Sequence, residues 1–355
     1  MTAPAPGIGP ALAVSGHDST AIIAFESVSK YYRGLAALDR VTLTLPRGSA
    51  LGLVGESGSG KTTCVRLALG LERPSSGRLT FAGAPYPRSR RAMRPLRRQV
   101  GFVLQDPYDS LDPRMQLRDV VSEPLRVHRL RGRDTDARVR EMLAAVGLAE
   151  APLDSYPARY SGGGRQRIAI ARALMTGPSV LLCDEPTSSL DVSVQAQIVN
   201  LLLEAKRSRD LSLLFVSHDL DLIGRIADNL AVMYRGRVVE SGPAELVRSS
   251  PRHHYTKSLH DAVPADHPAR RRLADPAPTP AGITGTAATA ATPGIATVAG
   301  SLVTRGVAPA GLAQADCCVF AGRCPAARAR CHAERPPTVT DADGRSHACF
   351  FPLAG

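Results

Sequence analysis

The sequence predicts an α/β fold in which helices cover a largely parallel sheet. Short runs rich in β-branched and other apolar residues alternate with helical patterns. Several runs are apolar on both faces and end in turn residues, as buried parallel strands do. The runs that we expect to form strands are 22–28, 41–45, 50–54, 100–104, 180–183, 211–216 and 230–234. At 355 residues with 44% hydrophobic residues, the chain is long enough for a sizeable core.

Composition narrows the class of protein and its partners. The chain carries 44 Lys and Arg against 32 Asp and Glu, so its formal net charge is +12. This charge is compatible with nucleic acid, anionic lipid or phosphate ligands and selects none of them. No apolar run approaches the ~20 residues that span a bilayer. Residues 1–20 have the composition of a disordered leader rather than of a signal peptide, so we expect a soluble cytosolic protein.

Changes in composition and residue pattern divide the chain into four parts. After the leader, residues 21–262 carry ordered patterns throughout, with a strand-free helical insert at about 115–176. Ala, Pro, Thr and Gly then dominate 263–315, which is typical of a linker. Five of the seven cysteines lie in the last part, 316–355. In a reducing cytosol, such a cluster indicates a metal before it indicates disulfides.

The strongest motif lies between the expected strand 50–54 and a helical run at 62–70. It reads Gly-Glu-Ser-Gly-Ser-Gly-Lys-Thr over 55–62 and fits G-x-x-x-x-G-K-[ST], the P-loop. Its glycines let the backbone wrap around phosphates, Lys61 would reach the β- and γ-phosphates, and Thr62 would ligate Mg²⁺. A flexible Gly/Ser turn is the alternative, but the strand–loop–helix context favours a nucleotide. The candidate binding residues are Gly55, Ser57, Gly58, Ser59, Gly60, Lys61, Thr62 and Thr63.

Two acidic residues follow another buried strand, 180–183. Asp184 is placed to hold Mg²⁺, through water, beside a P-loop. Glu185 points elsewhere and is a candidate general base for the attacking water. An acidic N-cap after a strand is the alternative for this pair. The presence of the P-loop favours the catalytic interpretation.

A glycine-rich turn opens the helical run 166–175. Ser161, Gly162, Gly163 and Gly164 precede it, and each glycine in a first helical turn costs up to ~1 kcal/mol relative to alanine. A close approach to an anion at the helix N-terminus would explain this cost. Taken alone, a loop with a serine cap is the simpler interpretation.

In this order, the motifs closely resemble the ATP-binding subunit of ABC transporters over about 22–259. The resemblance implies a P-loop NTPase core of RecA-like parallel strands, an antiparallel β subdomain and a helical subdomain, here with a Cys-rich C-terminal extension. It implies that two such domains sandwich two ATP molecules. Each ATP would lie between the P-loop of one subunit and the signature Ser161, Gly162 and Gly163 of the other.

The resemblance also assigns roles to single residues. Tyr32 resembles the aromatic residue that stacks on adenine, with Tyr31 as the second choice. Gln105 resembles the Q-loop residue that senses Mg²⁺ and water, and Asp191 the D-loop residue at the dimer seam. His218 resembles the switch that contacts the γ-phosphate and completes the catalytic set with Glu185 and Gln105.

The signature departs from the family at one position. The family reads Ser-Gly-Gly-Gln, and Gly164 replaces the glutamine here. We therefore hypothesise that the composite site formed by this signature is weakened without being inactive. The change also favours an asymmetric pair of subunits.

Further segments resemble the oligopeptide, dipeptide and nickel importer ATPases. They are 106–113, 156–161, 254–259 and the cysteine-rich tail. By that match, a 4Fe-4S cluster would be held by Cys318, Cys324, Cys331 and Cys349. The residues themselves leave zinc and unliganded thiols open, and the adjacent Cys317 blurs which of the pair would bind.

The sequence therefore predicts an ATPase that powers import of oligopeptides, dipeptides or a related solute such as nickel. It would act at the cytoplasmic face of the membrane with transmembrane permease subunits and a second ATP-binding subunit, and indirectly with an extracytoplasmic solute-binding protein. A soluble ABC ATPase acting on nucleic acid is the rival, and its single ATPase domain without a zinc insertion argues against it. Because Lys61, Asp184, Glu185 and His218 are all present, we rank a non-hydrolysing regulatory subunit last.

Overall fold

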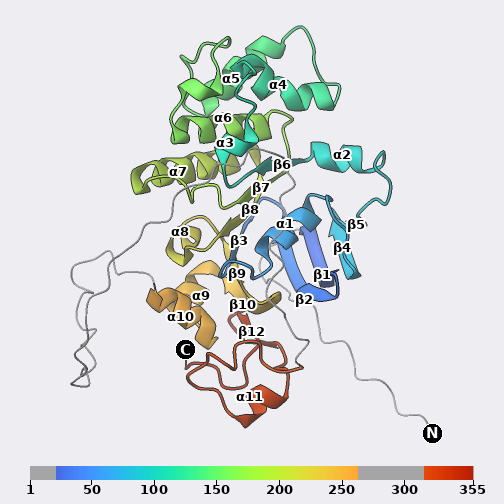
Figure 1. Cartoon of the computed structure of the whole chain (residues 1–355), viewed down its shortest axis with the longest axis vertical. Coiled ribbons are helices and arrows are strands. Elements are labelled where there is room, and N and C mark those ends of the chain that lie inside the picture. Colours follow the sequence, from blue (N-terminus) through green and yellow to red (C-terminus); the bar gives the residue numbers. More distant parts are fainter. Residues whose placement is uncertain (1–20, 263–315, 355) are drawn as a thin grey trace, which may run out of the picture. The chain divides into compact units, whose positions relative to one another are not determined.

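The computed structural model describes residues 21–262 and 316–354. The predicted leader 1–20 and linker 263–315 lie outside the described residues. In the described part, two β-sheets are combined with helices (Figure 1).

The larger sheet places the expected parallel strands side by side. Its eight strands lie in the order β11-β12-β10-β9-β3-β8-β7-β6. The neighbours from β9 to β6 are all parallel, and the pairs β9–β10, β10–β12 and β12–β11 are antiparallel. The bounds are β3 Ala50–Val54, β6 Val100–Val103, β7 Val180–Asp184, β8 Ser212–Ser217, β9 Asn229–Tyr234, β10 Arg237–Pro243, β11 Val339–Thr340 and β12 Ser346–His347.

The smaller sheet is antiparallel, with the order β2-β1-β4-β5. Its strands are β1 Ala21–Tyr32, β2 Leu35–Pro46, β4 Ser76–Phe81 and β5 Ala84–Pro85. The first two are longer than the sequence predicts, because they continue to a tight turn at Arg33 and Gly34, both of which have positive φ. β4, β5, β10, β11 and β12 were not among the expected strands.

Some helices connect the strands, and α3 to α6 pack against one another as a helical group. Among the described residues they are α1 Lys61–Ala68, α2 Met93–Arg98, α3 Pro107–Ser110, α4 Leu117–Val127, α5 Thr135–Ala145, the 3₁₀ helix η1 Pro157–Arg159, α6 Gly162–Leu174, α7 Val192–Arg209, α8 Leu220–Gly224, α9 Ala244–Ser249, α10 His254–Ala262 and α11 Ala329–Ala333. Helices α3, α4 and α5 pack against α6, as Figure 1 shows. No helix in the described ranges is long and apolar enough to cross a membrane.

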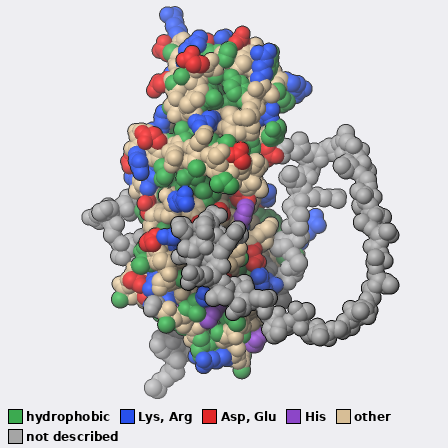
Figure 2. Space-filling view, turned by 90° about the vertical axis from the view of Figure 1, so that its left-hand side faces the viewer, with side chains coloured by type: hydrophobic (Ala, Val, Ile, Leu, Met, Phe, Trp, Pro, Cys, Tyr) green, Lys and Arg blue, Asp and Glu red, His purple; other side chains and the backbone are tan. Residues whose placement is uncertain are grey.

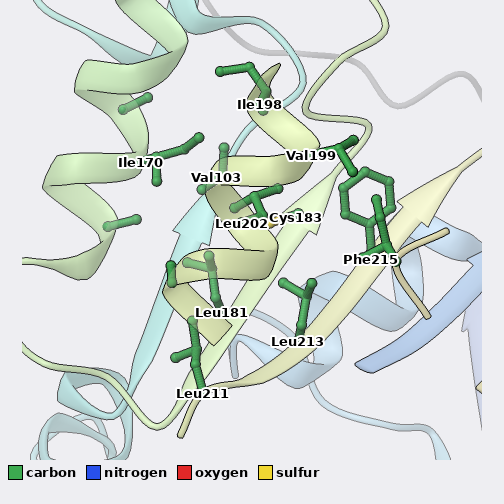
Figure 3. Packing of buried hydrophobic residues seen from close by; sticks show 14 of the residues in the cluster. Val103, Ile170, Leu181, Cys183, Ile198, Val199, Leu202, Leu211, Leu213 and Phe215 are labelled. Carbon is green, nitrogen blue, oxygen red and sulfur yellow. The ribbon is translucent and has the colours of Figure 1, made fainter. Parts of the chain in front are cut away.

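The core lies on both faces of the larger sheet, because successive side chains of its central strands point to opposite faces and both faces are covered. Leu213 and Phe215 of β8 belong to one cluster with residues of α7, and Figure 3 shows Val199 of α7 beside the ring of Phe215. Leu214 and Val216 point to the opposite face, which packs against α1 and the smaller sheet. A parallel sheet covered on both faces carries such continuous apolar strands. Packing on both faces holds β3 and β7 in place, and the candidate site lies at the ends of these strands.

The two isolated cysteines, Cys64 and Cys183, belong to this core. Both are fully buried, and burial raises the pKa of each thiol, that of Cys64 to about 12. They are therefore packed as small apolar residues.

The cysteine-rich tail adds strands to the larger sheet. Residues Glu240 and Ser241 of β10 pair with His347 and Ser346 of β12. Phe320 is only 3% exposed and belongs to the same core cluster as α7 and β8. The tail is thus docked by backbone pairing and by apolar burial together.

Candidate active site

The P-loop connects the end of β3 to the start of α1. Two of its glycines lie against backbone carbonyl groups of neighbouring strands. Gly60 has a φ of 107°, which side-chain-bearing residues rarely adopt, and a Cβ there would lie 2.8 Å from the carbonyl oxygen of Ala37. A Cβ on Gly55 would lie 2.1 Å from the carbonyl oxygen of Met233. Within the described chain, no side chain caps α1, so its first N–H groups face the loop.

Lys61 is the buried cation of this loop. Its Nζ donates to the carbonyl oxygens of Gly55 at 2.6 Å and Glu56 at 2.9 Å. Burial lowers the pKa of Lys61, and the nearby carboxylates of Glu185, Asp184 and Glu56 oppose that shift without cancelling it. The loop therefore holds the Lys61 amine close to the carboxylates of Asp184 and Glu185.

Thr62 and Asp184, the two predicted Mg²⁺ ligands, lie close together, and the Thr62 hydroxyl is within hydrogen-bond reach of the Asp184 carboxylate at the end of β7. Burial raises the pKa of Asp184, and the charge of Glu185 raises it further, while the Thr62 hydrogen bond and Lys61 oppose the rise. Carboxylate and hydroxyl oxygens are ligands that suit Mg²⁺.

Ser59 provides an independent sign of a ligand. Its Oγ is buried and has no hydrogen-bond partner in the described part of the chain. Buried hydroxyls normally have a partner, and this one lies in the loop that would surround phosphates. The residues present therefore fit a Mg²⁺-bound nucleotide.

Glu185 brings the three predicted catalytic residues together. Its Oε2 accepts a hydrogen bond from Gln105 Nε2 at 3.4 Å and lies 3.3 Å from His218 Nδ1. Its backbone has a φ of 46°, which is uncommon for a residue other than glycine. Its backbone N–H donates to the carbonyl oxygen of Val216 at 3.0 Å and holds the turn in place. Such strain is frequent at active sites, where it aims one side chain.

Tyr32 lies beside α1. Its hydroxyl donates to the Glu72 carboxylate and is also within hydrogen-bond reach of Thr63. Burial, followed by Glu72, raises the pKa of Tyr32 to about 12. Lys30 Nζ lies 5.1 Å from the centre of the Tyr32 ring. Tyr31, the second choice, is 37% exposed. The contact with Thr63 places Tyr32 next to the P-loop helix, and its adenine role stays a prediction.

The signature and the D-loop lie side by side. Ser161 Oγ accepts a hydrogen bond from the Gly164 N–H and so caps α6. A Cβ on Gly163 would lie 2.5 Å from Cγ1 of Val194, in the first turn of α7. Asp191 caps α7 by accepting from the Val194 N–H at 2.9 Å. In the described ranges, this signature makes no hydrogen bond to the P-loop of its own chain.

The four predicted cluster ligands line one cavity in the tail: Cys318, Cys324, Cys331 and Cys349. Cys317 does not line it, and its carbonyl oxygen instead accepts a hydrogen bond from Arg237 at 3.0 Å. Burial, with a smaller contribution from neighbouring thiols, raises the pKa of Cys318, Cys324 and Cys349, and that of Cys349 reaches about 11. In the parts of the chain described, no three His, Cys or acidic side chains are arranged to hold a single metal ion.

One contact with the P-loop was missed by the sequence analysis. The hydroxyl of the fully buried Tyr255 accepts a hydrogen bond from the Glu56 N–H at 2.9 Å. The two residues are 199 positions apart, and no spacing rule connects them. Tyr255 does lie in a segment that resembles peptide importers, which was the only available signal.

Comparisons with known proteins agree with this geometry. Residues 38–188 match the family model of the ABC transporter, and residues 239–288 match the oligopeptide/dipeptide transporter C-terminal region. The chain is similar to CbiO1 from Clostridium perfringens, described as part of the ABC transporter complex CbiONQ. The TM-score is 0.61 at 31% identity, over 65% of this chain and 92% of that one. The predicted fold class is therefore confirmed.

Curated relatives carry names from peptide transport. The oligopeptide transport ATP-binding protein OppD of Mycobacterium bovis is 48% identical over 66% of this chain, which spans 39% of that protein. The glutathione import ATP-binding protein GsiA of Escherichia coli is 45% identical over 69% of this chain and 40% of its own length. A probable peptide ABC transporter ATP-binding protein of Sinorhizobium fredii is 38% identical over 93% of this chain and 90% of its own length. The chain therefore belongs to the ABC transporter family of ATP-binding proteins, in its oligopeptide/dipeptide group.

Proposed function

We propose that this chain is the ATP-hydrolysing subunit of an importer for oligopeptides, dipeptides or a related solute. The observation that carries the proposal is the meeting of Gln105 and His218 at the carboxylate of Glu185, beside the buried Lys61. Relatives of the chain that are named for peptide, oligopeptide and glutathione import support the substrate class.

The residues divide the work of hydrolysis. Lys61 and the N–H groups of the P-loop bind the β- and γ-phosphates of ATP. Thr62 and Asp184, with Gln105 nearby, would hold Mg²⁺, which neutralises phosphate charge when bound. Glu185 takes the proton of the attacking water, and His218 orients the Glu185 carboxylate and contacts the γ-phosphate.

The signature completes the site of a second subunit. Gly163 packs against Val194 of α7, and within the described residues the signature makes no hydrogen bond to the P-loop of its own chain. A second ATP-binding subunit, either another copy or a paralogue, therefore supplies the other half of each site. Closure of this dimer on ATP moves transmembrane permease subunits docked near Gln105, which places the chain at the cytoplasmic face of the membrane. The permease receives its solute from an extracytoplasmic binding protein.

Reconstitution tests this function. The chain is co-purified with candidate permease subunits, placed in liposomes, and assayed for Mg²⁺-dependent ATP hydrolysis with and without peptide-loaded binding protein. We expect stimulation by the loaded binding protein. Stimulation by DNA or RNA instead, with no response to the permease, would favour the nucleic-acid rival.

The distribution of charged side chains argues against a nucleic-acid-binding function. Figure 2 shows Lys and Arg side chains interspersed with Asp and Glu over the face in view, rather than gathered in one stripe. Several arginines also pair within the protein. Arg237 and Arg335 both contact Asp39, and Arg252 contacts Asp341. A nucleic-acid site would need such cations to face the ligand.

For the tail, we propose that the four thiols around the shared cavity hold a 4Fe-4S cluster. A cluster of several iron atoms requires four cysteines around one space, which is the arrangement at this cavity. The cavity also includes Phe320 and Phe351, whose apolar rings would shield a cluster from water.

Metal analysis tests this assignment. After anaerobic purification, iron and acid-labile sulfide are expected in a ratio near one, with little zinc. Cys318→Ser should lose the iron, whereas Cys317→Ser should keep it, because Cys317 does not line the cavity. Zinc without sulfide, or metal lost only from Cys317→Ser, would contradict the assignment.

A further inference from the structure

The cysteine-rich tail contacts the P-loop directly. Arg323 Nη1 lies 2.9 Å from Oε2 of Glu56, the second residue of the P-loop motif, although 267 positions separate them. Arg323 immediately precedes Cys324, one of the four cavity thiols. The pair therefore joins the loop that carries two of these thiols to the loop that would carry ATP.

Glu56 is held on three sides. Its side chain accepts from Arg323, its N–H donates to the hydroxyl of Tyr255 at 2.9 Å, and its carbonyl oxygen accepts from Lys61 Nζ at 2.9 Å. The Ser59 N–H donates to the same carbonyl oxygen at 3.1 Å. A shift of Glu56 would therefore move the ammonium that binds phosphate, because Lys61 Nζ donates to the Glu56 carbonyl oxygen.

An aromatic cluster fixes the direction from which Arg323 approaches. Its guanidinium lies 5.8 Å from the ring centres of both Tyr234 and Phe320, and Nη1 lies 3.4 Å from the Tyr234 hydroxyl. Phe320 packs against Tyr234 at 5.3 Å and Tyr255 at 5.4 Å between ring centres. The ring contacts reduce the freedom of the long arginine side chain, although 52% of it is exposed. This arginine is thus oriented before any ligand arrives.

We propose that Arg323 is a positioning residue for the P-loop, and that its pairing with Glu56 makes the affinity for ATP depend on the docked tail. The proposal rests on the proposed function, since it concerns the same ATP site. Arg323 holds the side chain of Glu56, Tyr255 holds its N–H, and the carbonyl oxygen of Glu56 then presents Lys61 to the phosphates. Glu185, Gln105 and His218 are not part of this path, so the hydrolytic step is separate from it.

The test measures Mg²⁺-ATP binding and steady-state hydrolysis with the full-length chain. Arg323→Ala should raise the dissociation constant and KM for ATP about two- to fivefold, the range expected for an exposed ion pair, with kcat nearly unchanged. Arg323→Lys keeps the charge and should recover most of the affinity. Glu56→Gln combined with Arg323→Ala should add little to either single change, because both remove the same contact.

Arg330→Ala is the matched control. Arg330 also lies in the tail, pairs with Glu334 at 2.9 Å and stacks on Phe350, so it makes an ion pair and a ring contact away from the P-loop. Its KM for ATP should equal that of the unmodified chain. If the unmodified chain binds ATP and Arg323→Ala behaves as this control does, the positioning role is wrong while the proposed function stands. If the unmodified chain binds no Mg²⁺-ATP, the proposed function itself fails.

Discussion

At the scale of single residues, Glu185 is the position where backbone strain and chemistry coincide. Glu185→Gln keeps the shape of the side chain and its neighbours Gln105 and His218 but removes the base. We expect ATP to remain bound and to trap a dimer, while turnover falls about 10²- to 10⁴-fold. Gel filtration with ATP and a phosphate-release assay measure both effects. Glu245→Gln, at an exposed acid that pairs with Arg248, is the control. Normal turnover in Glu185→Gln would remove Glu185 from its role.

The second residue-scale prediction concerns Gly164. A Cβ at this position would lie 3.0 Å from Cβ of Tyr160, so Gly164→Gln requires a small shift of that side chain. The φ of Gly164 is one that other residues adopt without strain. Replacing this glycine should stabilise helix α6 by up to ~1 kcal/mol. We expect Gly164→Gln to raise the ATPase rate of the assembled subunits, because the restored amide braces the signature.

Gly164→Ala separates the two causes of such an increase. It brings the same Cβ and the same gain in helix stability without the amide. An equal rate increase in both variants would assign the effect to the helix, and no change in either would contradict a weakened signature.

At the scale of elements, Asp39 joins β2 to β10 and to the tail. Burial raises the pKa of Asp39, but Arg335 and Arg237 outweigh burial and hold it below the ordinary value. A lowered folded-state pKa adds stability above the unfolded value of about 3.8, and that stability is lost as pH falls through the folded pKa. Asp39→Asn should therefore lower the free energy of unfolding at pH 7 by about 1–3 kcal/mol, and by less near pH 3, which lies below the unfolded pKa.

Urea unfolding at the two pH values measures this difference. Asp154→Asn is the control. Asp154 is an exposed acid between α5 and η1, and its substitution should change the free energy of unfolding little at either pH. An equal loss for Asp39→Asn at both pH values would show that packing, rather than charge, gives Asp39 its effect.

At the scale of the whole molecule, the tail is part of the folded domain. Ending the chain at residue 315 would uncover the edge of β10 and the partners of Phe320. Exposed sheet edges promote association, and loss of a buried phenylalanine alone costs about 3–5 kcal/mol. We expect a lower melting temperature and more aggregation, measured by calorimetry and light scattering.

A deletion of residues 276–305 provides the matched control for this truncation. It shortens the predicted linker but leaves the tail attached, so its melting temperature should stay close to that of the full chain. If the truncated chain were as stable and as monomeric as this control, the tail contacts would contribute nothing to the fold.

The sequence alone determined the P-loop, the acidic pair Asp184–Glu185, the parallel strands and the family. These features depend on residues that are close together in the sequence, so apolar runs and fixed spacings reveal them without knowledge of tertiary neighbours. β4 escaped notice because Ser76, Gly77 and Arg78 are exposed and show no alternation, and only pairing with β1 makes them a strand.

Tertiary structure alone decided which distant groups meet. The contact of Arg323 with Glu56, the choice of Cys318 over Cys317 at the cavity, and the joining of Gln105 and His218 at one carboxylate oxygen of Glu185 all depend on chain folding. The physical reason is that hydrogen bonds and ion pairs act over about 3 Å in space and have no preferred separation along the chain.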